Sequence, residues 1–186
     1  MSPKEAGERP PYLPGDPPAE SVAAMIRVDH AGEYGATRIY DGQLAVMPRG
    51  PARTAVAEMA EQEARHLAAF DALIAERRVR PTLLQPLWQV AGFALGAATA
   101  LLGERAALAC TVAVEEVIDE HYRAQADRLA ETEPELKQKI LEFRDDELKH
   151  RGTALDLGAA ETPGYPLLSA AIKTGSRLAI WLSTRI

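Results

Sequence analysis

The chain is poor in cysteine, with a single residue of this type, Cys110, among 186. One cysteine excludes a disulfide within the chain, and the apolar residues around Cys110 favour a buried thiol with a packing role. The glycine-rich patterns G-x-G-x-x-G and G-x-x-x-x-G-K-[ST] are also absent, so no dinucleotide site or phosphate-binding loop is visible. Reducing equivalents would have to come from a partner, from the substrate or from a reductant that meets the surface.

An excess of basic residues is missing as well. The net charge is −6 and the isoelectric point is near 5.3, which argues against a nucleic-acid partner because phosphate neutralisation needs a basic face. Hydrophobic residues make up 47% of the chain, enough for the core of one domain. Residues 1–18 are rich in proline and lack the apolar run of a secretory signal and the basic amphipathic character of a transit peptide. We expect a flexible N-terminal tail at 1–18 and a single domain at 19–186.

No alternating strand pattern occurs, and the apolar spacing predicts an all-α fold. Six helices are expected, at about 19–46, 51–78, 87–102, 104–130, 134–157 and 166–183. Pro51 suits the first turn of the second helix, and the T-x-x-E pattern at 132–135 predicts a capping box that opens the fifth. The first helix also contains three glycines, which are unfavourable in a helix unless another backbone or a cofactor approaches closely: Gly32, Gly35 and Gly42.

A pattern that occurs twice is the strongest indication of function. An isolated glutamate is followed 30 or 32 residues later by Glu-x-x-His, and the residues involved are Glu33, Glu63, His66, Glu115, Glu147 and His150. Residues three apart lie on one helix face, so each Glu-x-x-His can hold one metal ion. Four helices that each bring a carboxylate inward, two of them with a histidine, supply the ligands of a ferritin-like di-iron or di-manganese centre. The alternative is four solvated carboxylates and two ordinary histidines.

The helix faces count against that alternative. Glu63 shares its face with apolar residues such as Met59 and Phe70, and a carboxylate in an apolar stripe is costly unless it is paired or binds a metal. The neighbours Glu115 and Glu116 separate clearly, because Glu115 aligns with apolar residues whereas Glu116 aligns with charged ones. Periodicity therefore predicts that Glu115 points inward and that Glu116 is solvated.

Charged residues are missing from one long stretch, 81–103, which is dense in leucine, alanine, tryptophan and phenylalanine. A buried crossover helix, a helix in the membrane interface and a membrane span would all fit, although 86–102 is at the short end of the range for a span. The helix expected at 166–183 favours the interface, because it carries basic residues and Trp181 while no acidic residue follows Glu161. We expect helices 87–102 and 166–183 to be membrane-interface additions to the bundle.

Four segments of the chain resemble the demethoxyubiquinone hydroxylases: VDHAGEYGA at 28–36, EQEARH at 61–66, TVAVEEVIDEHY at 111–122 and FRDDELKH at 143–150. The resemblance covers nearly all of the chain from about residue 19. It implies a membrane-bound di-iron monooxygenase of ubiquinone biosynthesis. Such an enzyme hydroxylates the quinol ring of demethoxyubiquinol (2-polyprenyl-3-methyl-6-methoxy-1,4-benzoquinol) with dioxygen.

The resemblance also implies roles for individual residues. One of two iron ions would be held by Glu33, Glu63 and His66, and the other by Glu115, Glu147 and His150. Of these, Glu63 and Glu147 would bridge the two ions. His121 and Tyr122 would lie near the substrate channel. Spacing rather than the resemblance adds Asp29 and Asp119, each one turn from a predicted ligand, which are expected to hydrogen-bond the ligating histidines, with ordinary surface carboxylates as the alternative.

The resemblance further implies partners and a location. The partners would be the polyprenyl benzoquinol, dioxygen, the membrane surface and other ubiquinone-biosynthesis proteins, with a homo-oligomer as a further expectation. The location would be the cytoplasmic face of the bacterial cell membrane, with peripheral attachment. Two alternatives remain at this point: an iron-storage or peroxide-handling protein of the bacterioferritin or rubrerythrin type, and a membrane adaptor without catalytic activity.

Overall fold

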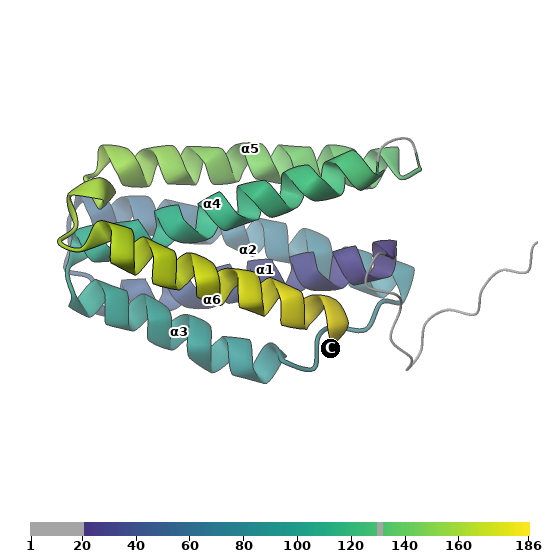
Figure 1. The fold of residues 1–186 in the computed structure, drawn as a ribbon, viewed down its shortest axis with the longest axis horizontal. Helices are drawn as coiled ribbons and strands as arrows, with labels where there is room; N and C mark the ends of the chain where they lie inside the picture. The colour runs from purple at the N-terminus through teal and green to yellow at the C-terminus, as the bar shows by residue number, and fades with distance from the viewer. Residues whose placement is uncertain (1–20, 130–131) are drawn as a thin grey trace, which may run out of the picture.

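The computed structural model describes residues 21–129 and 132–186, and the expected tail at 1–18 lies outside them. The described residues form α1 (Val22–Val46), α2 (Pro51–Arg77), α3 (Gln85–Leu101), α4 (Glu104–Leu129), α5 (Pro134–Asp156), the short 3₁₀ turn η1 (Ala159–Glu161) and α6 (Tyr165–Arg185). The prediction of an all-α fold is confirmed (Figure 1). The expected helices agree with the observed ones to within a few residues.

Local signals set most helix ends. Ser21 caps α1 by accepting a hydrogen bond from the Ala24 amide at 3.1 Å. Pro51 occupies the first turn of α2, where its missing N–H costs nothing. Gly158 and Gly164 adopt positive φ on either side of η1 and so reverse the chain between α5 and α6.

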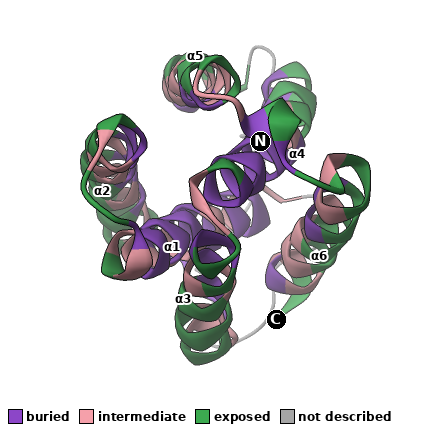
Figure 2. Ribbon diagram, turned by 90° about the vertical axis from the view of Figure 1, so that its left-hand side faces the viewer, coloured by how far each residue is buried: buried purple, intermediate pink, exposed green. Residues whose placement is uncertain are grey.

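The bundle consists of α1, α2, α4 and α5, and the other two helices lie against one side of it. Figure 2 shows α2 and α5 on the side away from α3 and α6. The third helix packs mainly along α1, and α6 packs mainly along α4. The buried crossover helix considered from the sequence is not what forms, because α3 buries only Gly92, Gly96, Thr99 and Ala100.

Glycines allow α1 and α3 to approach each other closely. A Cβ atom on Gly96 would lie 1.9 Å from the carbonyl oxygen of Ile39, and one on Gly42 would lie 2.1 Å from that of Phe93. Both distances are far below any real carbon–oxygen contact, so the two backbones touch at these positions. The expected close approach is therefore present at Gly42. At Gly32 and Gly35 a Cβ would meet nothing within 4 Å.

Candidate metal centre

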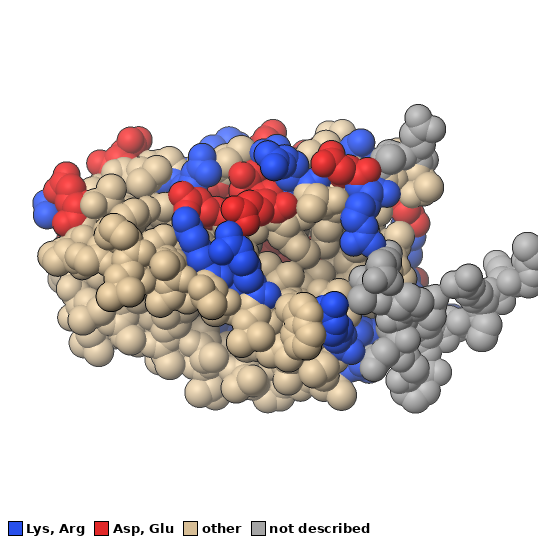
Figure 3. Space-filling view, in the orientation of Figure 1, with Lys and Arg blue, Asp and Glu red and all other residues tan. Residues whose placement is uncertain are grey.

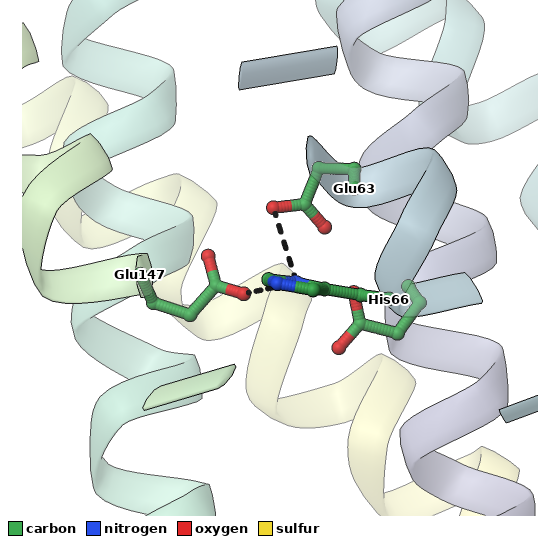
Figure 4. A group of neighbouring side chains, drawn as sticks. Glu63, His66 and Glu147 are labelled. Atoms are coloured by element: carbon green, nitrogen blue, oxygen red, sulfur yellow. Dashed lines mark ion pairs between the residues drawn. The ribbon is translucent and has the colours of Figure 1, made fainter. Parts of the chain in front are cut away.

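The four bundle helices bring the repeated motif to the centre of the bundle. Glu33 comes from α1, Glu63 and His66 from α2, Glu115 from α4, and Glu147 and His150 from α5, and each of the six is at most 3% exposed. Figure 4 shows the imidazole of His66 facing the carboxylates of Glu63 and Glu147, with its Nδ1 atom 3.2 Å from Glu147 Oε1. The opposite histidine is placed in the same way, since His150 Nδ1 lies 3.2 Å from Glu63 Oε1.

The six side chains form two overlapping groups that could each hold a metal ion. The first comprises Glu33, Glu63, His66 and Glu147, and the second comprises Glu63, Glu115, Glu147 and His150. Within each group the candidate ligand atoms lie within 4.8 Å of one another. Glu63 and Glu147 belong to both groups, so each of these carboxylates lies within reach of both candidate sites.

The buried polar atoms of this cluster fit a bound cation. Among the described residues, both carboxylate oxygens of Glu63 and one oxygen each of Glu33, Glu115 and Glu147 are buried and accept no hydrogen bond, although a histidine Nδ1 atom lies 3.2 Å from Glu63 Oε1 and from Glu147 Oε1. Buried polar atoms are normally paired, and buried carboxylates gathered in one place repel one another. A multivalent cation would satisfy these oxygens and neutralise their charge. Carboxylates with one histidine per group suit a hard metal such as iron or manganese.

The inward and outward glutamates of α4 separate as periodicity predicted. Glu115 is 2% exposed and its carboxylate joins the cluster. Glu116 is partly exposed, and its carboxylate forms an ion pair with Lys173 on α6. Adjacent residues on a helix point about 100° apart, so one neighbour enters the bundle while the other meets the surface.

Burial and mutual repulsion shift the acidities in the cluster. Burial raises the pKa of Glu63 well above its ordinary value, and the charges of Glu147 and Glu33 raise it further. Burial and Glu147 likewise raise the pKa of Glu115. Burial alone would lower the pKa of His66, but Glu147 and Glu33 overcome that effect and raise it to about 10. Without a cation, the folded cluster therefore keeps protons at pH values where the same groups in the unfolded chain have released them.

We expect the metal-free protein to lose stability as the pH rises from about 7 to about 10. The unfolded chain releases the His66 proton near pH 6.5, whereas the folded chain keeps it up to about pH 10. The folded state binds more protons in this window, so the free energy of unfolding falls by about 1.4 kcal/mol per pH unit for one proton. Glu63 and Glu115, whose pKa values are also raised, act with the same sign.

Denaturant titrations with a chelator present, at several pH values in this window, measure the effect. The His66→Gln variant removes one of the titrating groups and should show a shallower slope. A free energy of unfolding that rises between pH 7 and pH 10 would contradict the charge state described for this cluster.

The partners on the outer side of the two histidines differ from the expected ones. His66 Nε2 lies 3.4 Å from Asp146 Oδ2, and His150 Nε2 lies 3.3 Å from Gln62 Oε1. Asp29 is instead 3.1 Å from His121 Nε2, and Asp119 accepts a hydrogen bond from Arg144 at 2.6 Å. The sequence signal that could have identified the observed partners is adjacency, because Gln62 and Asp146 each directly precede a Glu of the motif.

Two tyrosines complete the inner surroundings. Tyr122, expected near the substrate channel, is buried and donates a hydrogen bond to Glu33. Tyr40 donates to Glu115 Oε1 at 2.8 Å, a contact that the sequence interpretation did not assign. The sequence signal that could have identified Tyr40 is its position seven residues after Glu33, on the same face of α1. His121 lies toward the surface, with 21% of its side chain exposed.

An apolar pocket of about 290 Å³ lies between α1, α3, α4 and α6. Gly32 and Gly35 line it, which explains why a Cβ at either position would meet open space. A much smaller cavity of about 10 Å³ borders Tyr40 and Glu115. Three residues line both spaces, and so the pocket adjoins the carboxylate cluster: Ala36, Ile39 and Val114.

Comparison with known proteins gives one consistent family. The family model described as "Ubiquinone biosynthesis protein COQ7" matches residues 20–183. A Rhodospirillum rubrum protein named 3-demethoxyubiquinol 3-hydroxylase is 58% identical over 176 residues, covering 94% of this chain and 83% of that protein. A Mus musculus protein named NADPH-dependent 3-demethoxyubiquinone 3-hydroxylase, mitochondrial, is 53% identical over 169 residues, covering 89% and 78%. A Saccharomyces cerevisiae protein named 5-demethoxyubiquinone hydroxylase, mitochondrial, is 40% identical over 201 residues, covering 96% and 86%.

Proposed function

We propose that the buried cluster is the reaction centre of a demethoxyubiquinol hydroxylase. The chain belongs to the COQ7 family of ubiquinone biosynthesis proteins. The observation that carries the proposal is the convergence of six buried carboxylate and imidazole side chains into two groups that share Glu63 and Glu147 and could each hold a metal ion. The names of the relatives favour this function over iron storage and over a role as a non-catalytic adaptor.

The metal groups would be held as the motif predicts. Glu33, Glu63 and His66 would hold one iron ion, while Glu115, Glu147 and His150 would hold the other. When bound, the two ions would supply the electrons that activate dioxygen at the ring. One oxygen atom converts the free ring C–H to C–OH, and the other leaves as water with two protons and two electrons. Those electrons would come from a reduced nicotinamide, as the name of the mouse relative indicates for that protein.

The protein's own side chains would organise this chemistry. Tyr40 and Tyr122 hydrogen-bond Glu115 and Glu33, which limits the rotation of carboxylates from helices α4 and α1. The phenyl ring of Phe143 stacks on the His66 imidazole with centroids 4.0 Å apart, so this histidine is held in orientation and shielded from water. A dry surrounding strengthens every electrostatic contact at the site.

The apolar pocket supports a substrate with an isoprenoid tail. Its volume of about 290 Å³ is near the lower end of the usual range for ligand pockets. Its inner end adjoins the cavity beside Glu115 through Ala36, Ile39 and Val114. A quinol headgroup that enters from the side of α3 and α6 would therefore meet the cluster first, while the tail remains among apolar residues.

The outer faces of α3 and α6 support attachment to a membrane surface. Leu87 and Val90 on α3 and Leu178 and Trp181 on α6 are each more than half exposed. Figure 3 shows a broad area without charged side chains over α3. Exposed apolar patches of this kind mark interaction or membrane sites. No helix in the described ranges is both long and apolar enough to cross a bilayer.

Pairing within the protein reduces the role of the basic residues of α6. The ammonium group of Lys173 pairs with Glu116, and Arg177 pairs with Glu120 at 2.9 Å. The guanidinium of Arg185 lies 4.5 Å from the centroid of the Trp181 ring. Insertion of apolar side chains would therefore provide most of the attachment. We propose that this face rests peripherally on the cytoplasmic face of the bacterial cell membrane, where it takes up the polyprenyl benzoquinol.

The substitution of Leu178 by Ser together with Trp181 by Glu should release the protein from lipid vesicles. Both side chains are exposed on α6, so the fold should tolerate the change, while transfer of apolar area to the bilayer is lost. We expect at least about a tenfold weaker partition onto vesicles of anionic phospholipid, measured by co-sedimentation. Leu155→Glu, on the exposed face of α5, is the matched control and should bind as the wild type does. Equal binding by all three proteins would contradict the docking face.

Product analysis tests the function itself. Cells that lack this protein should accumulate the demethoxy precursor and contain little ubiquinone. The purified protein, loaded anaerobically with ferrous iron, should convert the demethoxyquinol to the hydroxylated quinol when dioxygen and a reduced nicotinamide are added. Normal ubiquinone in the deletion strain, or storage of many iron atoms per chain without a hydroxylated product, would overturn the proposal.

A further inference from the structure

Thr111 has a hydroxyl group that the fold leaves unpaired. Five threonines are buried in the described ranges, and in four of them the hydroxyl donates to a backbone carbonyl at 2.8 to 3.0 Å: Thr37, Thr82, Thr99 and Thr162. Thr111 is 2% exposed, and its Oγ1 has no hydrogen-bond partner in the part of the chain that the structure describes. Burial without a partner is costly for a hydroxyl, so this exception requires an explanation.

A neighbouring side chain occupies the carbonyl that Thr111 would ordinarily use. A helical threonine usually turns its hydroxyl back to the carbonyl oxygen four residues earlier, which is that of Ala107. That oxygen already accepts a hydrogen bond from Gln43 Nε2 at 2.9 Å, in addition to the amide of its own helix. The Thr111 hydroxyl is thereby left available for another partner.

The cavity of about 10 Å³ supplies the space for such a partner. Thr111, Tyr40 and Glu115 line it together with three apolar residues. Glu115 Oε2 is also buried without a hydrogen-bond partner, while Tyr40 donates to the other oxygen of the same carboxylate. The volume corresponds to about one water molecule. With Glu115 bound to a metal, the hydroxyls of Thr111 and Tyr40 still provide two partners, within the two to four that an ordered water uses. The cavity is thus suited to one oxygen atom.

The position of the cavity limits which ligand atoms could reach it. Ala36, Ile39 and Val114 separate it from the larger apolar pocket and line both spaces. A planar ring that lies at the inner end of the pocket can project a ring oxygen between these side chains, although the ring itself is too large for the cavity. The oxygen would arrive beside Thr111 with the ring edge near the carboxylate cluster.

We propose that the hydroxyl of Thr111 hydrogen-bonds one ring oxygen of the quinol in this cavity, and that a water molecule occupies the same place when no substrate is bound. The inference rests on the proposed function and assigns a substrate-binding residue to it. The hydroxyl can accept from a ring O–H group and can donate to a ring oxygen. Because the partner oxygen is fixed relative to the cluster, Thr111 sets which ring carbon faces the reaction centre.

Binding of the quinol and of two analogues tests the proposal. The ligands are a short-tailed demethoxyquinol and two phenols, each of which lacks one of its ring hydroxyls. Quenching of the tryptophan fluorescence gives dissociation constants in anaerobic, iron-loaded protein, because Trp88, one of the two tryptophans, lines the pocket. In the wild type, one phenol should bind about tenfold more weakly than the quinol, the size expected for one lost hydrogen bond.

Thr111→Val should bind the quinol about tenfold more weakly and should no longer distinguish it from that phenol. Thr111→Ser keeps the hydroxyl and should restore the discrimination. Thr99→Val is the matched control, since Thr99 is equally buried but donates to carbonyls of its own helix, and it should bind all three ligands as the wild type does. The iron content should be unchanged in every variant, because Thr111 is not among the candidate ligands.

Two results would overturn the proposal and leave the function intact. One is a wild type that hydroxylates the quinol yet binds both phenols as tightly as the quinol. The other is Thr111→Val that still discriminates between them; should this variant not fold, Thr111→Ala replaces it in the same titration. A wild type that neither binds nor hydroxylates the quinol would instead overturn the proposed function.

Discussion

Glu63→Gln should abolish hydroxylation and, in the metal-free state, raise the thermal stability of the protein. Glu63 belongs to both candidate metal groups, so its loss would remove a ligand from each. Both of its carboxylate oxygens are buried, with His150 Nδ1 3.2 Å from Oε1, and burial and the neighbouring carboxylates raise its pKa. A neutral amide of the same shape removes the free-energy cost of keeping this carboxyl group protonated in the folded state. We expect turnover to fall by about a thousandfold or more and the free energy of unfolding of the metal-free protein to rise by about 1 kcal/mol.

Iron analysis and calorimetry distinguish this outcome from simple unfolding. The variant should bind fewer than two ferrous ions per chain, and added iron should stabilise it less than it stabilises the wild type. Glu116→Gln is the matched control: this residue adjoins a predicted ligand but pairs with Lys173 at the surface, and its replacement should leave activity and iron content unchanged. Full activity of Glu63→Gln would show that Glu63 is not an essential metal ligand. A metal-free variant that melts at a lower temperature than the metal-free wild type would show that the buried carboxyl group does not destabilise the fold.

The parts of the fold that were predictable are those that depend on short-range pattern. The spacing of apolar residues distinguishes Glu115 from Glu116 because the side chains of a helix have a fixed angular period. The Glu-x-x-His repeats place their two side chains one turn apart whatever the surroundings are. For this reason the helices and the inward direction of the six motif side chains could be anticipated from the sequence, whereas the sharing of Glu63 and Glu147 between two groups was implied only by the family resemblance.

The contacts that were not predicted depend on how far one helix is shifted along another. Asp146 reaches His66 from a different helix, and Gln62 reaches His150 in the same way. No spacing within one helix encodes such a register, so the choice of Asp29 and Asp119 by proximity to a ligand selected carboxylates that have other partners. Helix capping was also misjudged, because Thr132 donates to the Leu129 carbonyl and the N-cap of α5 is Glu133.

The glycines of α1 and α3 could be identified from the sequence, but the separate role of each one depends on how the two helices pack. Gly42 and Gly96 lie where the two backbones touch, but Gly35 faces the apolar pocket. Its carbonyl oxygen lies 3.0 Å from where a Cβ on Gly92 would be, so the pocket begins directly beside the contact. Glycine therefore allows two helices to touch at one position and leaves room for a ligand at another.

Substitution by alanine at these positions should give opposite results. Gly96→Ala would place its Cβ 1.9 Å from the Ile39 carbonyl oxygen and 3.0 Å from the Gln43 amide nitrogen. Backbone cannot rotate away as a side chain can, so α3 must move off α1. We expect a loss of about 3 kcal/mol in the free energy of unfolding, which for a chain of this size lowers the melting temperature by roughly 6–12 °C. Gly35→Ala meets nothing within 4 Å and should raise stability by up to about 1 kcal/mol.

Thermal melts of both variants, with binding of a long-tailed and a short-tailed quinol, separate the two roles. Gly35→Ala should fold well but weaken the long-tailed ligand more than the short-tailed one, because its methyl group takes up space where the tail would lie. Gly96→Ala should weaken both ligands together, since displacement of α3 opens the pocket wall that Trp88 and Gly92 form. Equal stability of the two variants would show that α1 and α3 are not in backbone contact, and unchanged binding of the long-tailed quinol by Gly35→Ala would show that the tail does not occupy this pocket.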